Sequence, residues 1–322
     1  MIFAGTRHNT ISSTQLSSGN LLADRRTEYA HMLATEGDHA DAADLMRQAL
    51  ELVPDWAAGW FRLADYEEKS GRKEAAVEAL HKVLELNPED IFGASLKLAF
   101  LGSAPEGGQP PSHHVERLFD DYADRFDISL VDKLGYNVPE TLTALLEERI
   151  GKTRIKHLVD LGCGTGLFGE RVRARTDYLE GYDLSTNMLA KAAEKDVYDH
   201  LGQADLFLPP ETSGLFDGKA SHRASLVSAT DVFLYLGNLD SIFVLISELL
   251  APGGIFAFST EDAGEDGDVV LRQSLRYAHS RGYIRRRCAD FGLAVLAERE
   301  TVIRNDGGKP LSGMLFLTQK TA

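Results

Sequence analysis

A glycine-rich run at residues 159–166, Val-Asp-Leu-Gly-Cys-Gly-Thr-Gly, combines residue types that suit the binding of a small ligand. Gly162, Gly164 and Gly166 occupy alternate positions after an apolar stretch. Glycine tolerates tight turns and lets a ligand approach the main chain closely. In open α/β sheets, ligands bind beyond the carboxyl ends of the strands. We therefore expect this loop to hold a nucleoside-containing cofactor.

The spacing of these glycines distinguishes two kinds of cofactor. A dinucleotide fingerprint needs G-x-G-x-x-G, and counted from Gly162 its last position is Leu167, which disfavours a nicotinamide-dependent dehydrogenase. The observed G-x-G-x-G, preceded by an apolar strand and Asp160, resembles motif I of class I S-adenosylmethionine (SAM)-dependent methyltransferases. The resemblance implies that SAM binds here and leaves as S-adenosylhomocysteine (SAH), and we expect no metal.

Residues after the next two expected strands have roles under the same resemblance. Asp183 would accept hydrogen bonds from both ribose hydroxyls, unless it only caps a helix. Asp205 would accept from the adenine amino group, unless it is a surface turn acid, and Met188 would contact adenine, unless it is a core residue. The expected cofactor-binding residues are Asp160, Gly162, Cys163, Gly164, Gly166, Asp183, Leu184, Met188, Asp205, Leu206, Thr230 and Tyr122.

The segment at residues 228–237 leaves the fourth expected strand at the ligand edge of the sheet, where the acceptor docks in this fold. Asp231 and Tyr235 are its polar candidates for a catalytic role. Either could orient or deprotonate a methyl acceptor, and a structural role for each stays open. A base is needed only if the accepting atom carries a proton at neutral pH.

Two pairs of side chains with helical spacing complete the set of candidates. Tyr122 and Phe126 are four residues apart, so they share a helix face and could cover the cofactor or pack in the core. His279 and Tyr283 have the same spacing ahead of the sixth expected strand. His279 is the third candidate catalytic residue, and a structural histidine is the alternative.

The elements that must position these residues alternate between short strands and helices. Strands are expected at residues 155–160, 178–183, 200–203, 226–229, 255–259, 294–300 and 314–318. Helices are expected at residues 167–174, 186–193, 239–250 and 281–291, after a helical stretch at 115–150. This alternation predicts an α/β domain with a Rossmann-like, mostly parallel sheet of about seven strands and helices on both faces.

An internal repeat precedes this domain. Gly37, Ala42, Leu50, Leu52 and Pro54 recur 34 residues later as glycine, alanine, leucine, leucine and proline. This period resembles the tetratricopeptide repeat, a helix–turn–helix unit. We expect two repeats and a capping helix, in which the glycines permit turns and the prolines end helices.

Composition shifts mark the domain boundaries. Three prolines and three glycines fall within residues 102–112, which indicates a linker. The predicted organisation is a poorly ordered lead-in at 1–20, an all-α repeat domain at 21–102, a linker at 103–112 and a methyltransferase domain at 113–322.

Further stretches resemble predicted bacterial methyltransferases that carry tetratricopeptide repeats. They lie at residues 118–127, 134–139, 235–239, 277–280 and 283–284. The chain departs from that group at Ser225 and in a longer run at 211–223, and we expect both departures to affect a surface edge rather than the cofactor site.

Charge and composition limit the partners. The formal net charge of −15 would repel a nucleic-acid backbone or an anionic membrane. The arginines at 281 and 285–287 form a basic patch, which we interpret as a solvated helix face. The chain has two cysteines and no apolar run long enough to span a bilayer, so we expect a reducing, cytoplasmic location.

Two functions remain open after the sequence is read. The first is methyl transfer from SAM to a small-molecule or protein acceptor by in-line displacement, with the repeats aiding substrate or partner binding. The second is a non-catalytic SAM-binding adaptor that uses the repeats for protein interaction. Dimerisation or a purely structural cap is a further possibility for the repeats.

Overall fold

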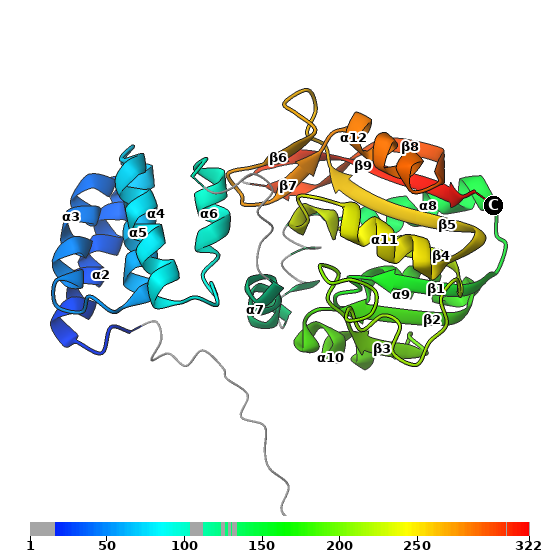
Figure 1. The fold of residues 1–322 in the computed structure, drawn as a ribbon, viewed down its shortest axis with the longest axis horizontal. Helices are drawn as coiled ribbons and strands as arrows, with labels where there is room; N and C mark the ends of the chain where they lie inside the picture. The colour runs from blue at the N-terminus through cyan, green and yellow to red at the C-terminus, as the bar shows by residue number, and fades with distance from the viewer. Residues whose placement is uncertain are drawn as a thin grey trace, which may run out of the picture. The chain divides into compact units, whose positions relative to one another are not determined.

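The computed structural model describes residues 17–103, 112–123, 126–127, 130, 134–306 and 308–321, without the side chains of residues 121 and 122. The chain divides into two compact units, Met1–Glu106 and Gly107–Ala322 (Figure 1). The expected lead-in lies outside the described residues up to residue 16, and the expected linker lies outside them from 104 to 111. The finer domain boundaries therefore stay predictions.

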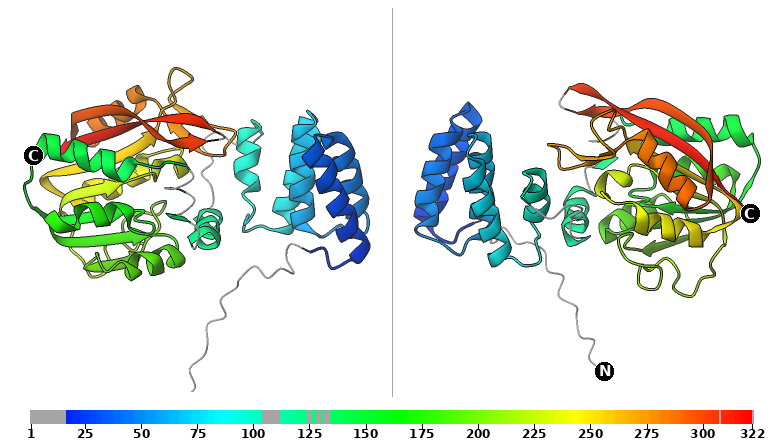
Figure 2. Two further views of the ribbon diagram at one scale, coloured as in Figure 1. Left: turned by 180° about the vertical axis from the view of Figure 1, so that it is seen from behind. Right: turned by 45° about the horizontal axis from the view of Figure 1, so that its top comes forward.

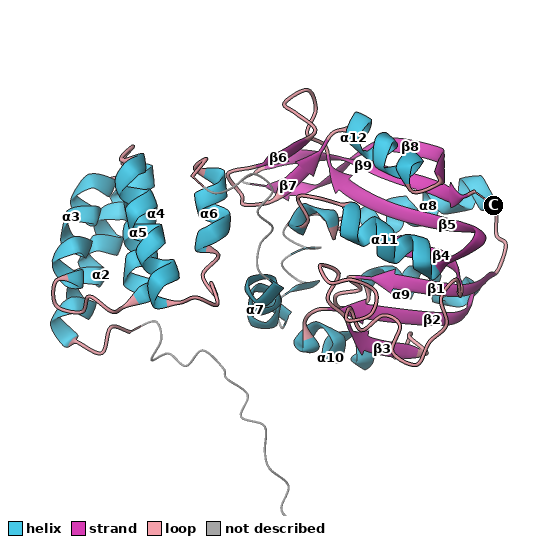
Figure 3. Cartoon of the chain, in the orientation of Figure 1, coloured by secondary structure: helices cyan, strands magenta, loops and turns pink. Residues whose placement is uncertain are grey.

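The first unit consists of packed helices (Figure 3). Its described helices are α2 (Leu21–Glu36), α3 (His39–Leu50), α4 (Ala57–Lys69), α5 (Lys73–Leu86) and α6 (Ala94–Phe100). α2 packs on α3, α3 on α4, α4 on α5 and α5 on α6, so the two helix pairs and the shorter last helix form one stack. The predicted pair of helix–turn–helix repeats is confirmed.

Glycines form the turn between the two helices of each repeat, and a buried ion pair connects one repeat to the next. Gly37 and Gly71 follow the first helix of each repeat with φ angles of 96° and 81°, a region that glycine adopts without steric cost. Glu67 on α4 is fully buried and bonds to Arg47 on α3 and to Arg72. This carboxylate therefore links the first repeat to the second.

The second unit is built on a seven-stranded sheet. Its strands are β1 (Ile155–Leu161), β2 (Thr176–Asp183), β3 (His200–Gln203), β4 (Ala224–Ala229), β5 (Leu250–Glu261), β8 (Leu293–Asp306) and β9 (Lys309–Lys320). They lie in the order β3-β2-β1-β4-β5-β9-β8. The first five run parallel, and β9 is antiparallel to β5 and β8. The predicted Rossmann-like sheet is confirmed.

Helices cover both faces of this sheet (Figure 2). The helices of this unit are α7 (Ser112–Tyr122), α8 (Val138–Ile150), α9 (Leu167–Val172), α10 (Thr186–Glu194), α11 (Asp240–Leu249) and α12 (Arg281–Asp290), of which α7 lies at the ends of the strands (Figure 1). Neighbouring strand residues serve opposite cores, because side chains alternate along a strand. Val227 packs in the core of α11 and α12, whereas Leu226 packs in the core of α8 and α9.

Three expectations about the elements need correction. β8 and β9 are 14 and 12 residues long, longer than the short strands expected. They form a hairpin whose pairing continues past Gly313, the last residue of β9 that pairs with β5. A two-stranded sheet of β6 (Val269–Leu271) and β7 (Tyr277–His279) was not expected. His279 and Tyr283 do not share a helix, because His279 ends β7 and Ser280 caps α12.

A buried carboxylate fastens the run at 211–223 to the sheet. Glu180 on β2 is 1 % exposed and accepts hydrogen bonds from His157, Lys219 and Arg223. Burial opposes its ionisation, but the bonds from His157 and Arg223 outweigh it and hold the pKa of Glu180 well below its usual value. Lys219 and Arg223 of the long run are therefore bound to the sheet through Glu180.

Replacement of Glu180 by glutamine should lower the free energy of unfolding by about 2 kcal/mol, because charge-assisted hydrogen bonds are lost and the cations around it are left uncompensated. A depressed carboxyl pKa contributes stability that is present above the unfolded value of 4.5 and is lost as pH falls toward the folded value. Urea titrations at pH 7 and pH 4 should therefore show a smaller difference between wild type and variant at pH 4. Glu194→Gln, on an exposed side chain of α10, is the matched control, and an equal loss at both pH values would contradict the assignment.

Candidate functional site

The glycine loop between β1 and α9 has the backbone that its sequence predicts. Gly162, Gly164 and Gly166 have φ angles of 62°, 54° and 89°, where a side chain is strained. A Cβ on Gly162 would lie 2.5 Å from the Val232 side chain, whereas one on Gly164 would meet nothing closer than 4.0 Å. The loop thus packs tightly on one side and leaves its backbone open to a cavity on the other.

Asp183, at the end of β2, organises this loop. Its Oδ2 accepts the Gly164 N–H at 2.8 Å, and its Oδ1 accepts the Ser185 N–H at 2.9 Å. Burial raises the pKa of Asp183 to about 6 in spite of these bonds. Each oxygen keeps a lone pair for a further donor, so the residue fits a ribose diol held beside the loop.

Asp160 supports the loop from within the sheet. It is fully buried, and its two oxygens accept hydrogen bonds of 2.7 Å from the Tyr198 and Ser228 hydroxyls. Burial raises the pKa of Asp160 to about 6 as well. Asp160 does not line the cavity, so its place is beneath the glycine loop rather than against a ligand.

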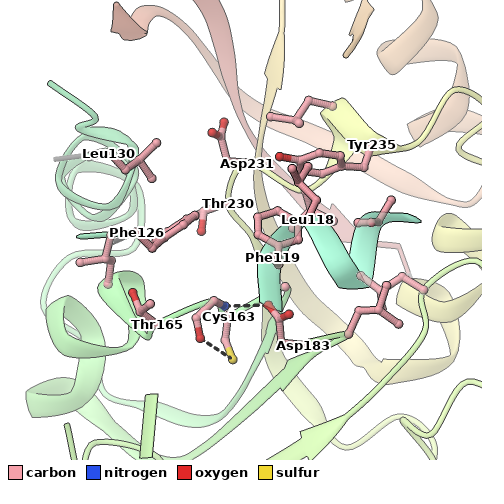
Figure 4. Close-up of a pocket in the computed structure, with 18 of the residues that line it drawn as sticks. Leu118, Phe119, Phe126, Leu130, Cys163, Thr165, Asp183, Thr230, Asp231 and Tyr235 are labelled. Carbon is pink, nitrogen blue, oxygen red and sulfur yellow. Dashed lines mark hydrogen bonds between the residues drawn. The ribbon is translucent and has the colours of Figure 1, made fainter. Parts of the chain in front are cut away.

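A cavity of about 350 Å³ opens above the loop. Figure 4 shows Cys163, Thr165 and Asp183 on one side of it and Asp231 and Tyr235 on the other. The walls between them are largely apolar and aromatic. The other lining residues include Leu118, Phe119, Phe126, Leu130, Leu134, Tyr136, Leu184, Leu206, Phe207, Thr230, Val232, Arg276 and Arg304.

The segment before α8 contributes part of this cover. Asp120 on α7 accepts a hydrogen bond from the Ser185 hydroxyl at 2.5 Å, and Asp127 accepts one from Lys195 at 3.1 Å. Phe119 packs edge-on against Tyr235, with ring centroids 5.1 Å apart. The side chain of Tyr122, predicted to cover the cofactor, lies outside the described residues.

A charged cluster forms the far side of the cavity. Arg304 on β8 is 1 % exposed and donates to Asp231 at 2.6 Å and to Glu261 on β5 at 2.5 Å. Asp231 follows β4 with a φ of 58°, and its N–H donates to Ser259. A positive φ at aspartate is uncommon and occurs where the surrounding structure enforces it, here to aim the carboxylate at Arg304.

The structure brings most of the predicted residues to this cavity. Those that line it are Gly162, Cys163, Gly164, Asp183, Leu184, Leu206, Thr230, Asp231 and Tyr235. Gly166 belongs to the loop but does not line the cavity, since a Cβ there would face Tyr198 at 3.0 Å, and Met188 is fully buried outside the lining. Asp205 accepts the Phe207 N–H at 2.9 Å and is also outside the lining, so its contact with adenine stays a prediction.

His279 does not reach the cavity. It is fully buried, its Nε2 lies 3.2 Å from the Gly237 carbonyl oxygen, and its Nδ1 lies 3.1 Å from the Thr260 hydroxyl. Burial lowers the pKa of His279 to about 4, so the ring is neutral at pH 7. Its ring stacks on Tyr283, with centroids 5.7 Å apart. These contacts support the structural alternative for this histidine.

Sequence reasoning missed the two arginines of the cavity, Arg276 and Arg304. Neither belongs to a motif, and both come from segments after β5 that are far from the glycine loop in sequence. Residues 298–304, Glu-Arg-Glu-Thr-Val-Ile-Arg, show no alternation of charged and apolar residues, and the strand expected at 294–300 ended before Arg304.

Two family models match the chain. A methyltransferase domain matches residues 159–256, and a tetratricopeptide repeat matches residues 33–98. Arg276 and Arg304 lie beyond the first match. Among the described residues, no group of three histidine, cysteine or acidic side chains is arranged to hold a metal, and no helix is long and apolar enough to cross a membrane.

Curated relatives and a solved structure are similar to parts of the chain. Malonyl-[acyl-carrier protein] O-methyltransferase of Enterobacter lignolyticus is 30% identical over 155 residues, which cover 47% of this chain and 58% of the relative. A second one, from Ilyobacter polytropus, is 26% identical over 165 residues, 50% of this chain and 55% of the relative. The chain thus spans just over half the length of these relatives.

The structure of N-methyltransferase NodS from Bradyrhizobium japonicum, in complex with SAH, superimposes with a TM-score of 0.50 at 15% identity and covers 64% of this chain and 98% of NodS. At this identity the likeness concerns the fold. The sheet order, the glycine loop and the matched family models agree with one another. The second unit is therefore a methyltransferase domain of the class I, SAM-dependent type, and it follows a unit of tetratricopeptide repeats in the chain.

Proposed function

We propose that this protein transfers the methyl group of SAM to a small-molecule or protein acceptor. The observation that carries the proposal is that the glycine loop and Asp183 line the same cavity as Asp231 and Tyr235. The cavity has a nucleoside side and a separate charged side, so donor and acceptor can meet inside it. Gly162, Cys163, Gly164 and Asp183 would hold SAM, which supplies an activated methyl group.

The residues of this chain mainly align the reactants and exclude water. The Gly164 amide and Asp183 fix the nucleoside side, while Phe119 and Tyr235 pack together over the middle of the cavity. An in-line displacement gains most from such positioning in a dry site. Asp231, held by Arg304, orients the acceptor side rather than supplying a mobile base.

The repeat unit would recruit the acceptor or a protein partner. Tetratricopeptide repeats present curved helical surfaces to ligands, and the two repeats here form one stack with a continuous core. The curated relatives act, by name, on a malonyl group carried by a protein, which is consistent with an acceptor delivered by a macromolecule. Both cysteines are unpaired and buried, which suits a reducing compartment such as the cytoplasm.

The test is transfer of labelled methyl from SAM to components of a cell extract. The expected result is a labelled product that depends on the full chain and that decreases in Asp183→Ala when SAM is kept below its dissociation constant for the wild type. Saturable SAM binding without any labelled product, across extracts from several growth conditions, would instead favour the non-catalytic adaptor. Tighter binding of a nicotinamide dinucleotide than of SAM would overturn the choice of cofactor.

Binding of SAH should weaken as the pH falls, because the pKa of Asp183 is about 6 in the free protein. Hydrogen bonds from ribose hydroxyls favour the ionised carboxylate, so binding lowers this pKa and releases a proton below pH 6. The dissociation constant should therefore rise about tenfold between pH 7.5 and pH 5. Calorimetry in two buffers with different ionisation enthalpies measures the proton release. Asp183→Asn should abolish it, and its survival in that variant would point to Asp160 instead.

A further inference from the structure

Arg276 differs from the four arginines of α12, the helix that follows β7. It lies directly before β7, is half-buried and lines the cavity. Within the part of the chain that the structure describes, its guanidinium has no hydrogen bond or ion pair. The arginines of α12 all have carboxylate partners: Arg281 with Glu300, Arg285 with Glu298, Arg286 with Asp268, and Arg287 with Asp240 and Asp290.

Arg276 faces the charged side of the cavity. It is close enough to Asp231, Tyr235 and Glu261 to act on the pKa of each, lowering it against the effect of burial. Arg304 lines the same wall, and its Nε has no hydrogen-bond partner although the side chain is almost completely buried. Two guanidinium groups therefore border the acceptor side, one fixed by carboxylates and one free to bind a ligand.

The described lining offers no available general base. Asp183 is assigned to the ribose, and Asp231 is ion-paired with Arg304. Burial raises the pKa values of Tyr136, Tyr235 and Cys163, so these groups are protonated at pH 7. Among the described lining residues, an acceptor atom that must lose a proton would find no group to take it. A carboxylate is already deprotonated at this pH and needs no base.

We propose that the methyl acceptor is a carboxylate that binds to Arg276, with Arg304 as the second cation of the site, and that the product is a methyl ester. This inference rests on the proposed methyl transfer. An arginine guanidinium matches the planar geometry of a carboxylate through two parallel hydrogen bonds. The guanidinium of Arg276, which has no carboxylate partner among the described residues, can supply these two hydrogen bonds.

The step balances without a further reactant. A carboxylate oxygen forms a bond to the methyl carbon, the bond from that carbon to sulfur breaks, and its electron pair stays on sulfur. No proton is taken up or released. The negative acceptor and the positive sulfonium become two uncharged groups, which the apolar walls around Leu118 and Phe126 favour. The ester no longer pairs with Arg276, so loss of charge also promotes product release.

The first experiment asks what kind of bond the label enters. Extract is incubated with the full chain and methyl-labelled SAM, and the labelled fraction is treated with mild alkali. Methyl esters release volatile labelled methanol under this treatment, whereas methyl groups on nitrogen, carbon or thioether sulfur stay in place. Volatile label is the expected result. Alkali-stable label would overturn this inference and leave the proposed function standing, and the absence of any label would overturn both.

The second experiment tests Arg276 itself. In Arg276→Gln the KM for the acceptor should rise at least tenfold, with the dissociation constant of SAH changed less than twofold. Arg276→Lys should have a KM between those of wild type and Arg276→Gln, since lysine keeps the positive charge but lacks the two parallel N–H donors of the guanidinium. Arg285→Gln, which removes an exposed and paired arginine of α12, is the matched control.

A binding measurement complements the kinetics. The free acid recovered after alkali treatment is titrated into SAH-loaded protein, and it should bind wild type at least tenfold more tightly than Arg276→Gln. Unchanged KM and unchanged acid binding in Arg276→Gln would overturn the assignment. Weakened SAH binding in the same variant would overturn it in another way, by placing Arg276 on the carboxylate of the cofactor.

Discussion

Asp183→Ala is expected to weaken SAH binding by about 1–3 kcal/mol, which is roughly 5- to 150-fold in the dissociation constant. The carboxylate has two tasks in the structure. It fixes the glycine loop through the Gly164 N–H and the next turn through the Ser185 N–H, and it keeps lone pairs for the ribose hydroxyls. Loss of the side chain removes both the direct bonds and the support of the loop. Titration calorimetry with SAH measures the effect.

The matched control is Asp177→Ala. Asp177 lies on the same strand as Asp183, is exposed and pairs with Arg154 outside the cavity. The Asp177→Ala variant should bind SAH with the same affinity as wild type. The Asp183 variant should remain folded, because the ionisation of this buried carboxylate adds no stability at pH 7. Its folded pKa exceeds the unfolded value, so its ionisation makes folding less favourable as the pH rises between about 4 and 6. Unchanged SAH affinity in this folded variant would refute the assignment.

Arg304→Met should destabilise the methyltransferase domain by about 3–5 kcal/mol. The substitution keeps an apolar stem of similar length but leaves the buried carboxylates of Asp231 and Glu261 without their shared cation. Breaking a buried ion pair from one side is costly because the remaining charge stays desolvated. The loss should shrink as the pH falls. Burial already raises the pKa of both acids, and removal of the arginine raises them further, so the folded state gains stability by taking up protons.

The two units allow an internal control for this measurement. Both tryptophans of the chain, Trp56 and Trp60, lie in the repeat unit, so tryptophan fluorescence follows that unit and should not change. Hydrogen exchange in β8 and β9 reports the sheet and should accelerate. The double variant Arg304→Met/Glu261→Gln should regain part of the loss, because only one buried charge is left. A loss below about 1 kcal/mol in the single variant would show that the cluster is open to water.

The elements that could be predicted from the sequence are those whose structure is determined by the types and spacing of a few neighbouring residues. β3 was expected at residues 200–203 and is found at His200–Gln203, and the glycine spacing placed the loop between β1 and α9. Gly37 and Gly71 marked the turns of the repeats because their conformation demands glycine. In each case a few neighbouring residues determine the structure.

The acceptor side could not be predicted for the opposite reason. Arg304 comes close to Asp231 through the pairing of β9 with β5 and of β8 with β9. Arg276 reaches the same wall through the packing of β7 on β5 and on the turn at Phe233–Tyr235. Such long-range contacts leave no local signature in the sequence. His279 was chosen because it lies four residues before Tyr283, but it ends β7, and Ser280 caps α12, which begins at Arg281. Asp231 and Tyr235 were found because they directly follow a strand at the ligand edge.

The sheet order has a consequence for how such enzymes diversify. The glycine loop and Asp183 follow the parallel strands β1 and β2, whereas both arginines of the charged side come from chain after β5. Under the proposed function, a change in residues 262–306 would therefore alter which acceptor is methylated and leave the residues that would hold SAM unchanged. Transplanting this C-terminal segment into another methyltransferase domain would exchange acceptor selectivity as a module, with the affinity for the donor inherited from the host.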